Sequence, residues 1–139
     1  MYYRIVVPVD SAGHSKNALI HAIKLAQQTG SRPIVVYINP IIPLYLNFGL
    51  GPLRKYVPLE NSNALDILKD IIAGMGIPPD AVDKRAATGD PTTLIIKMAA
   101  EERADLIVID NKLFCLLAGF RSISYSVIKY ATCPVLVVK

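Results

Sequence analysis

The sequence predicts an α/β fold in which helices cover both faces of an open, five-stranded parallel sheet. Short runs rich in β-branched residues alternate along the chain with longer segments that have apolar residues at helical spacing. The short runs are almost continuously apolar, as expected of strands buried on both faces. Hydrophobic residues make up 53% and charged residues 19% of the 139 residues, which agrees with a doubly covered sheet. The length suits one domain, so we expect residues 1–139 to form a single one.

Residues 3–9 (YRIVVPV) predict the first buried strand, because apolar and β-branched residues run through them almost without interruption. A polar turn over residues 10–15 follows. Residues 15–29 have apolar side chains at helical spacing and polar residues on the opposite face, and Gly30 supplies a helix stop. We therefore expect an amphipathic helix that packs on one side.

Residues 32–39 (RPIVVYIN) predict the second strand. The loop expected after it, residues 40–58, is broken by proline and glycine and is long for a small domain. Apolar residues at helical spacing then predict a second helix over about residues 60–75. The Gly-Ile-Pro-Pro sequence at 76–79 ends this helix.

A weaker, more polar strand is expected at residues 82–87, as suits the edge of a sheet. Asp90 is placed to cap the next helix and Pro91 occupies its first position. This third helix is expected to continue to Arg103. Residues 105–109 (DLIVI) predict the fourth strand.

A loop at residues 110–121, a short helix at 122–130 and a final strand at 134–138 (PVLVV) complete the chain. Right-handed crossovers limit the topologies that these elements can adopt. If the third helix carries the chain back across the first strand, the strand order is 3-2-1-4-5. The switch point, where such sheets bind ligands, then lies beside Asp10 and Asp110.

Composition and charge exclude several classes of protein. The hydrophobic content excludes intrinsic disorder, and prolines and glycines break the longest uncharged run, residues 33–53, so we expect no membrane span. The net charge is +4, but the basic residues are scattered and no aromatic residues are interleaved with them, so we expect no nucleic-acid partner. The first residues lack the apolar segment typical of a secretory signal. The expected location is therefore cytoplasmic.

The two cysteines, Cys115 and Cys133, are too few for a disulfide framework or a zinc site. We expect them to be buried thiols. The histidines have no nucleophile spaced to pair with them, so His14 is expected to be a turn residue and His21 a solvated helix residue.

Five segments resemble the universal stress protein family, and together they span the chain: IVVPVD at 5–10, HSKNAL at 14–19, GDP at 89–91, ADLIVI at 104–109 and CPVLVV at 133–138. The resemblance lies in their order and spacing rather than in any one piece. It implies a Rossmann-like fold related to adenine-nucleotide-binding domains. It also implies a homodimer through the last strand, by way of Val135, Leu136, Val137 and Val138.

One branch of this family binds ATP through the motif G-x2-G-x9-G-(S/T) after the fourth strand, and the other branch lacks the motif. Aligned on ADLIVI, the first two glycine positions fall at Asp110 and Leu113. Aligned on CPVLVV, the third falls at Arg121, because the loop between the two segments is about two residues shorter than is usual in the family. Ser122 and Ser124 keep the anion-binding character of the helix start. Gly119 is a displaced third glycine if the gap is placed differently.

The energetics oppose a triphosphate at this motif. Asp110 would place a negative charge toward the phosphates, and the side chains at 110, 113 and 121 would fill space that glycine leaves open. We therefore expect no bound cofactor, with ATP and Mg²⁺ as the alternative. The family positions that would contact a ligand are Pro8, Val9, Asp10, Ile109, Asp110, Arg121, Ser122, Ile123 and Ser124.

Two further interpretations stay open for the aspartates. Asp10 suits a turn or capping carboxylate better than a nucleoside contact. Asp10 and Asp110 together could hold a divalent cation, but two carboxylates are a weak ligand set. An ion pair from Arg121 or Lys112 to these carboxylates is the favoured expectation.

Two apolar segments are unusual beside a phosphate site, namely residues 113–120 and the loop 41–53. Both are expected at the same end of the sheet. They form either a hydrophobic lid, which we favour, or a surface for a protein partner.

These observations predict a dimeric universal stress protein of the branch without ATP, acting as a regulatory or interaction module and not as an enzyme. One alternative is a nucleotide-binding module or slow ATPase that uses Pro8, Val9, Asp10, Ser122 and Ser124. A second is a docking domain that presents residues 41–53 and 113–120 to a partner.

Overall fold

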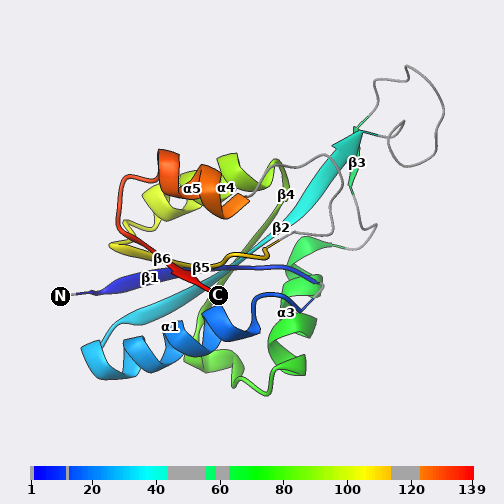
Figure 1. Cartoon of the computed structure of the whole chain (residues 1–139). Coiled ribbons are helices and arrows are strands. Elements are labelled where there is room, and N and C mark those ends of the chain that lie inside the picture. The colour runs from blue at the N-terminus through cyan, green and yellow to red at the C-terminus, as the bar shows by residue number, and fades with distance from the viewer. Residues whose placement is uncertain (1, 12, 44–55, 59–62, 114–122) are drawn as a thin grey trace.

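Helices pack on both faces of a central sheet whose middle strands are fully buried (Figure 1). The computed structural model describes residues 2–11, 13–43, 56–58, 63–113 and 123–139. Parallel pairing joins the strands in the order β4-β2-β1-β5-β6. Numbered along the chain, these five strands have the order 3-2-1-4-5, which confirms the predicted topology. Their bounds are Arg4–Val9 for β1, Arg32–Pro43 for β2, Asp83–Gly89 for β4, Leu106–Asp110 for β5 and Val135–Val138 for β6.

Two pairs of helices cover the sheet, one pair on each face (Figure 1). On one face lie α1 (Lys16–Thr29) and α3 (Ala64–Gly74), and on the other lie α4 (Pro91–Glu101) and α5 (Ile123–Tyr130). A short 3-10 helix, η1 (Pro79–Ala81), precedes β4. Because successive strand residues point to opposite faces, the sheet divides the core into two clusters. None of the helices in the described part of the chain is long and apolar enough to cross a membrane.

The helix starts follow capping side chains. The Asp90 carboxylate accepts from the backbone N–H of Thr93 at 3.0 Å, and Pro91 opens α4, as the sequence predicts. Asn63 caps α3 by accepting from the N–H of Leu65 at 2.8 Å. The predicted second helix therefore begins later than expected, at Ala64, and residues 59–62 lie outside the described residues.

The segment predicted as one loop over residues 40–58 contains the end of β2 and a short strand, β3 (Tyr56–Pro58). Residues 41–43 extend β2 and pair antiparallel with β3. The prolines at 40 and 43 predict a break in this region, but proline is tolerated at strand ends and on edges, where no N–H is needed. The remaining residues of this segment, 44–55, lie outside the described residues.

Candidate functional site

Buried polar side chains gather toward the carboxyl ends of the strands. A parallel α/β sheet binds ligands at this end, beside the two strands where the winding direction reverses. Those strands are β1 and β5, because the chain leads from β1 to β2 on one side and from β5 to β6 on the other. The buried polar or charged side chains of the described residues are Asp10, Ser15, Asn39, Asp110 and Ser124.

Pro8 ends the pairing between β1 and β5 before the strands reach this end. The ladder covers residues 5–6 of β1 and 106–107 of β5, whereas β1 pairs with β2 over all of residues 4–9. One step further, the register requires the N–H of residue 8 to donate to the carbonyl of Val108. Proline has no N–H to give. The last residues of β1 and β5 therefore lie outside their shared ladder.

Asp10 closes the turn between β1 and α1. Its Oδ1 accepts from the backbone N–H of His14 at 3.1 Å, and its Oδ2 lies 3.1 Å from His14 Nδ1. The backbone N–H of Asp10 donates to Ser15 Oγ at 2.9 Å. Asp10 is only 2% exposed. It is thus a turn carboxylate, the interpretation that the sequence favours.

Asp110 organises a second turn, at the end of β5. Its Oδ1 accepts from the backbone N–H of Lys112 at 2.8 Å, and its carbonyl accepts from the N–H of Leu113 at 3.2 Å. The N–H of Asn111 donates to the carbonyl of Val138 at 3.0 Å, which ties this turn to β6. Among the ion pairs of the described residues, none joins the Lys112 ammonium to Asp110, and the alternative ion pair, from Arg121, lies outside the described residues. The backbone of Lys112 stabilises the carboxylate instead.

Leu113 occupies the second motif position and lies in the hydrophobic core. Its side chain is 4% exposed and belongs to the cluster beneath α4 and α5, together with Ile123 and Val127. Residues 114–122, which include Arg121, Ser122, Gly119 and Cys115, lie outside the described residues. The hydrophobic lid predicted for residues 113–120 stays a prediction, because only its first residue, Leu113, is among the described residues.

The other predicted ligand positions are mostly closed by packing. Val9 and Ile109 are fully buried in the clusters on opposite faces of the sheet, so only their backbone faces the switch point. Ile123 and Ser124, in the first turn of α5, are 3% and 6% exposed. No group of three or more histidine, cysteine, aspartate or glutamate side chains in the described ranges could hold a metal ion.

Sequence reasoning missed the support that His14 and Ser15 give to Asp10. Both residues are treated there as parts of a simple turn, whereas each bonds Asp10 directly. The spacing carried a signal, because a histidine four residues after an aspartate and a serine five residues after it can both hydrogen-bond that aspartate within one turn. Asn39, buried in β2, had no such signal.

A model of the universal stress protein family matches residues 1–139. The chain belongs to the universal stress protein family. A universal stress protein of Methanocaldococcus jannaschii is 30% identical over 146 residues, which cover all of this chain and 83% of that protein. The resemblance found in the sequence is thereby confirmed.

Solved structures of universal stress proteins have the same fold. One from Lactobacillus plantarum has a TM-score of 0.70 at 22% identity and covers 99% of this chain and 98% of its own. One in complex with cAMP has a TM-score of 0.65 at 20% identity, covering 99% and 97%. One from Archaeoglobus fulgidus in complex with dAMP has a TM-score of 0.62 at 23% identity, covering 99% and 98%. At these identities the likeness shows the fold alone.

Proposed function

We propose that this universal stress protein is a dimeric regulatory or interaction module that does not bind ATP through the family's glycine motif. One observation carries the proposal: the first two glycine positions hold a nearly buried carboxylate, Asp110, and a core leucine, Leu113. Both side chains are built into the local structure, one through a backbone bond and the other through the core.

The physical case against a triphosphate follows from these two residues. A glycine loop brings backbone N–H groups close to phosphate oxygens, and a side chain at the same position prevents that approach. The Asp110 carboxylate adds repulsion between like charges in a site partly removed from water. Leu113 cannot turn outward cheaply, since exposing a leucine side chain costs about 2–3 kcal/mol.

The dimer is proposed through β6, at the edge of the sheet. Among the described strands β6 pairs with β5 alone, so its outer edge can accept another strand. Leu136 on β6 is 41% exposed, and it lines a shallow hollow with Ile20 and Leu25 of α1. On the other face, the preceding helix α5 exposes three large side chains, Tyr125, Ile128 and Tyr130. This apolar surface on both sides of the edge suits a self-complementary contact.

A catalytic role is not part of the proposal. His14 and Asp10 bond each other within a turn, which explains their proximity without a reaction. Burial raises the pKa of the Cys133 thiol, and the Asp105 carboxylate raises it further. A thiol with a raised pKa stays protonated near neutral pH and is a poor nucleophile.

A second candidate function is the binding of an adenine nucleotide with a single phosphate. Two universal stress proteins of the same fold are described as complexes with cAMP and with dAMP. In this chain the ladder between β1 and β5 stops at Pro8, which leaves backbone at the switch point for a nucleoside. A monophosphate carries less charge toward Asp110 than ATP does.

Calorimetric titration of the protein with ATP·Mg²⁺, AMP and cAMP separates the two functions. We expect no heat of binding with ATP at micromolar protein, because Asp110 and Leu113 block the phosphate loop. The matched variant replaces Asp110, Leu113 and Arg121 by glycine, and circular dichroism verifies that it is folded. The variant is expected to gain ATP affinity. Micromolar binding of ATP by the unmodified protein would overturn the proposal, and binding of AMP or cAMP alone would establish the second candidate.

A further inference from the structure

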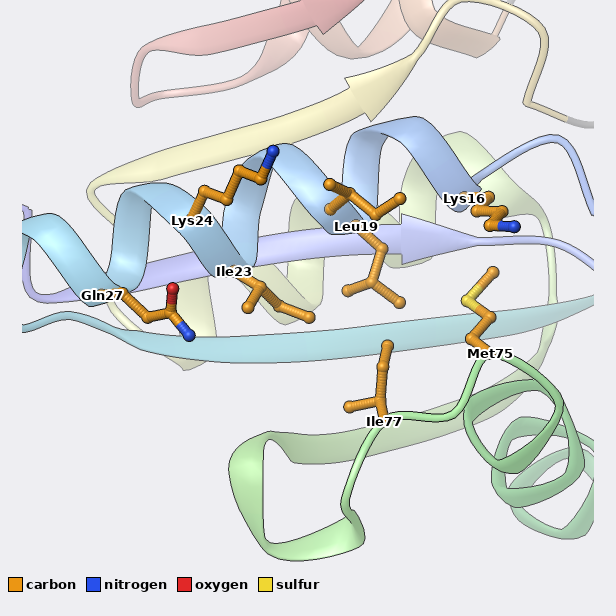
Figure 2. A pocket seen from close by; sticks show the side chains of 8 residues that line it. Lys16, Leu19, Ile23, Lys24, Gln27, Met75 and Ile77 are labelled. Atoms are coloured by element: carbon orange, nitrogen blue, oxygen red, sulfur yellow. The ribbon is translucent and has the colours of Figure 1, made fainter.

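An apolar hollow lies beside α1, on the face of the sheet that carries α1 and α3. Its volume is about 260 Å³, and it is separate from the switch-point residues. Figure 2 shows side chains of α1 on one side of the hollow and those of Met75 and Ile77 on the other. The lining residues are Lys16, Leu19, Ile20, Ile23, Lys24, Gln27, Met75 and Ile77.

The end of α3 sets the far wall of this hollow. Gly76 adopts a left-handed conformation with φ 71°, and the N–H of Ile77 donates to the carbonyl of Ile72 at 3.3 Å. Together with the bond from Gly76 N–H to the Ala73 carbonyl at 3.0 Å, this is a Schellman motif. The motif fixes Met75 and Ile77 on either side of the turn, so the wall is a rigid part of the fold.

The near wall is an amphipathic stripe of α1 that intramolecular packing covers only in part. Leu19 is fully buried at the base, Ile23 is half-buried, and Ile20 is 38% exposed beside it. A half-covered apolar stripe next to apolar residues of a second element is a surface on which further apolar side chains can be buried.

The charged residues that line the hollow have one sign. Lys16 and Lys24 lie at its rim, and neither the lining residues nor α1 itself contains an aspartate or glutamate. Among the ion pairs of the described residues, none involves either lysine. Eight residues of helix separate the two positions, which corresponds to about 12 Å along the helix axis. The hollow therefore complements an apolar object with negative charges roughly two helical turns apart.

The size of the hollow favours side chains of a protein over a free small molecule. Pockets that enclose a ligand usually measure about 300–1,000 Å³, whereas this one is smaller and partly open to solvent. It can take two or three apolar side chains. An amphipathic helix presents such side chains in a single stripe with charged residues on its flanks.

We propose that the hollow between α1 and the Met75–Ile77 turn docks an acidic amphipathic helix of a partner protein. The helix lays its apolar stripe against Ile20, Ile23 and Ile77, and its flanking carboxylates pair with Lys16 and Lys24. This inference rests on the proposed role as an interaction module and names the surface and the partner class for it. It does not depend on an empty switch point. Ile20 and Lys24 also line the hollow beside Leu136 at the proposed dimer edge, so the two surfaces adjoin and share these residues.

The test uses a designed peptide of about 18 residues, a length at which a helix can form in water. The acidic version has a leucine stripe flanked by glutamates, and the basic version has the same stripe flanked by lysines. Fluorescence anisotropy measures affinity for the protein at low and high salt, and methyl NMR locates the contact. We expect the acidic peptide to bind about tenfold or more tightly than the basic one, with a preference that salt weakens. The shifted methyl groups are expected at Ile20, Ile23, Met75 and Ile77.

Charge reversal supplies the matched controls. Lys24→Glu is expected to weaken the binding of the acidic peptide. The double variant Lys16→Glu/Lys24→Glu is expected to bind the basic peptide more tightly than the acidic one. A glutamate in the first turn of α1 agrees with the helix dipole, so the fold tolerates it. Lys97→Glu makes the same change at an exposed position of α4, on the opposite face, and is expected to leave both affinities unchanged.

Several outcomes would overturn the inference. These are equal binding of the two peptides, equal weakening by Lys97→Glu and Lys24→Glu, methyl shifts elsewhere, or no binding. Shifts of the same methyl groups with decanoate but not with the peptides would assign the hollow to a fatty acyl chain instead. The titration with nucleotides uses other residues, so its failure is distinguishable from failure here. Because Lys24 also lies near the proposed dimer edge, sedimentation velocity on Lys24→Glu separates a loss of docking from a loss of the dimer.

Discussion

Arg103 follows α4 in the left-handed backbone conformation, which glycine adopts at the ends of two other helices. The helices α1, α3 and α4 all end in a left-handed residue, which is Gly30, Gly76 and Arg103 respectively. At Arg103 the φ angle is 52°, and the N–H of Ala104 donates to the Ala99 carbonyl at 2.9 Å, as a Schellman motif requires. For a residue that has a Cβ, this conformation costs about 1–2 kcal/mol.

Arg103→Gly is therefore expected to stabilise the protein. Glycine removes the clash of Cβ with the backbone but adds freedom to the unfolded chain, so the net gain in the free energy of unfolding is about 0.5–1 kcal/mol. Urea denaturation at one protein concentration measures the gain. Arg103→Ala keeps the Cβ and is the control. If alanine stabilised as much as glycine, the backbone strain would not be the cause.

At the scale of elements, the turn after β5 is held in place by three residues of its own. Asp110, Asn111 and Leu113 each fasten this turn to a different neighbour: the backbone of Lys112, the last strand β6 and the core under α4. A glycine at position 110 would remove the carboxylate that accepts from Lys112, and a glycine at position 113 would remove the side chain in the core. The turn is thus held by contacts to the fold, and a ligand is not needed to order it.

Leu113→Ala is expected to lower the free energy of unfolding by about 2–4 kcal/mol, because it leaves a cavity in the cluster beneath α4 and α5. Leu65→Ala, on the exposed side of α3 at 39% exposure, is the matched control and is expected to cost under about 1 kcal/mol. Chemical denaturation followed by circular dichroism compares the two. Similar losses for both variants would show that Leu113 does not hold the turn in the core.

The strands and helices were predictable from the sequence because their signals are local. Continuous apolar runs marked β1, β2, β5 and β6, and Asp90 with Pro91 marked the start of α4. The hairpin of β2 with β3 was not predictable, since its prolines at 40 and 43 act as breakers unless the pairing partner is known. Asp10 was placed correctly in its turn. Its bond to His14 depends on the three-dimensional turn, and the backbone contact of Lys112 to Asp110 depends on the end of β5.

At the scale of the whole molecule, the two edges of the sheet differ in polarity. The β4 edge is polar and carries an ion pair to β2, from Arg32 to Asp83 at 2.9 Å. The β6 edge is apolar, with Leu136 exposed and α5 presenting Tyr125, Ile128 and Tyr130 nearby. Only the second edge is suited to remove more apolar surface from water. This asymmetry is the reason to place the proposed dimer at β6.

Leu136→Asp is expected to convert the dimer into a monomer, because the symmetry of the contact places two carboxylates in the apolar interface. Sedimentation velocity at tens of micromolar protein checks this. Leu65→Asp introduces the same charge on α3 at a similar exposure, 39% against 41%, and is expected to leave the dimer intact. A monomeric unmodified protein, or a monomer with both variants, would contradict the proposed contact.

Pro8 also has a role before the sheet is complete. The strand order places β5 beside β1, although β5 is synthesised after β1, β2 and β4. Until β5 docks, that side of β1 is an open edge on which another nascent chain could add a strand. Residue 8 faces this side in the register and has no N–H to offer. The proline that interrupts the ladder in the finished sheet thereby protects the folding chain from aggregation while the β5 side of β1 is still unpaired.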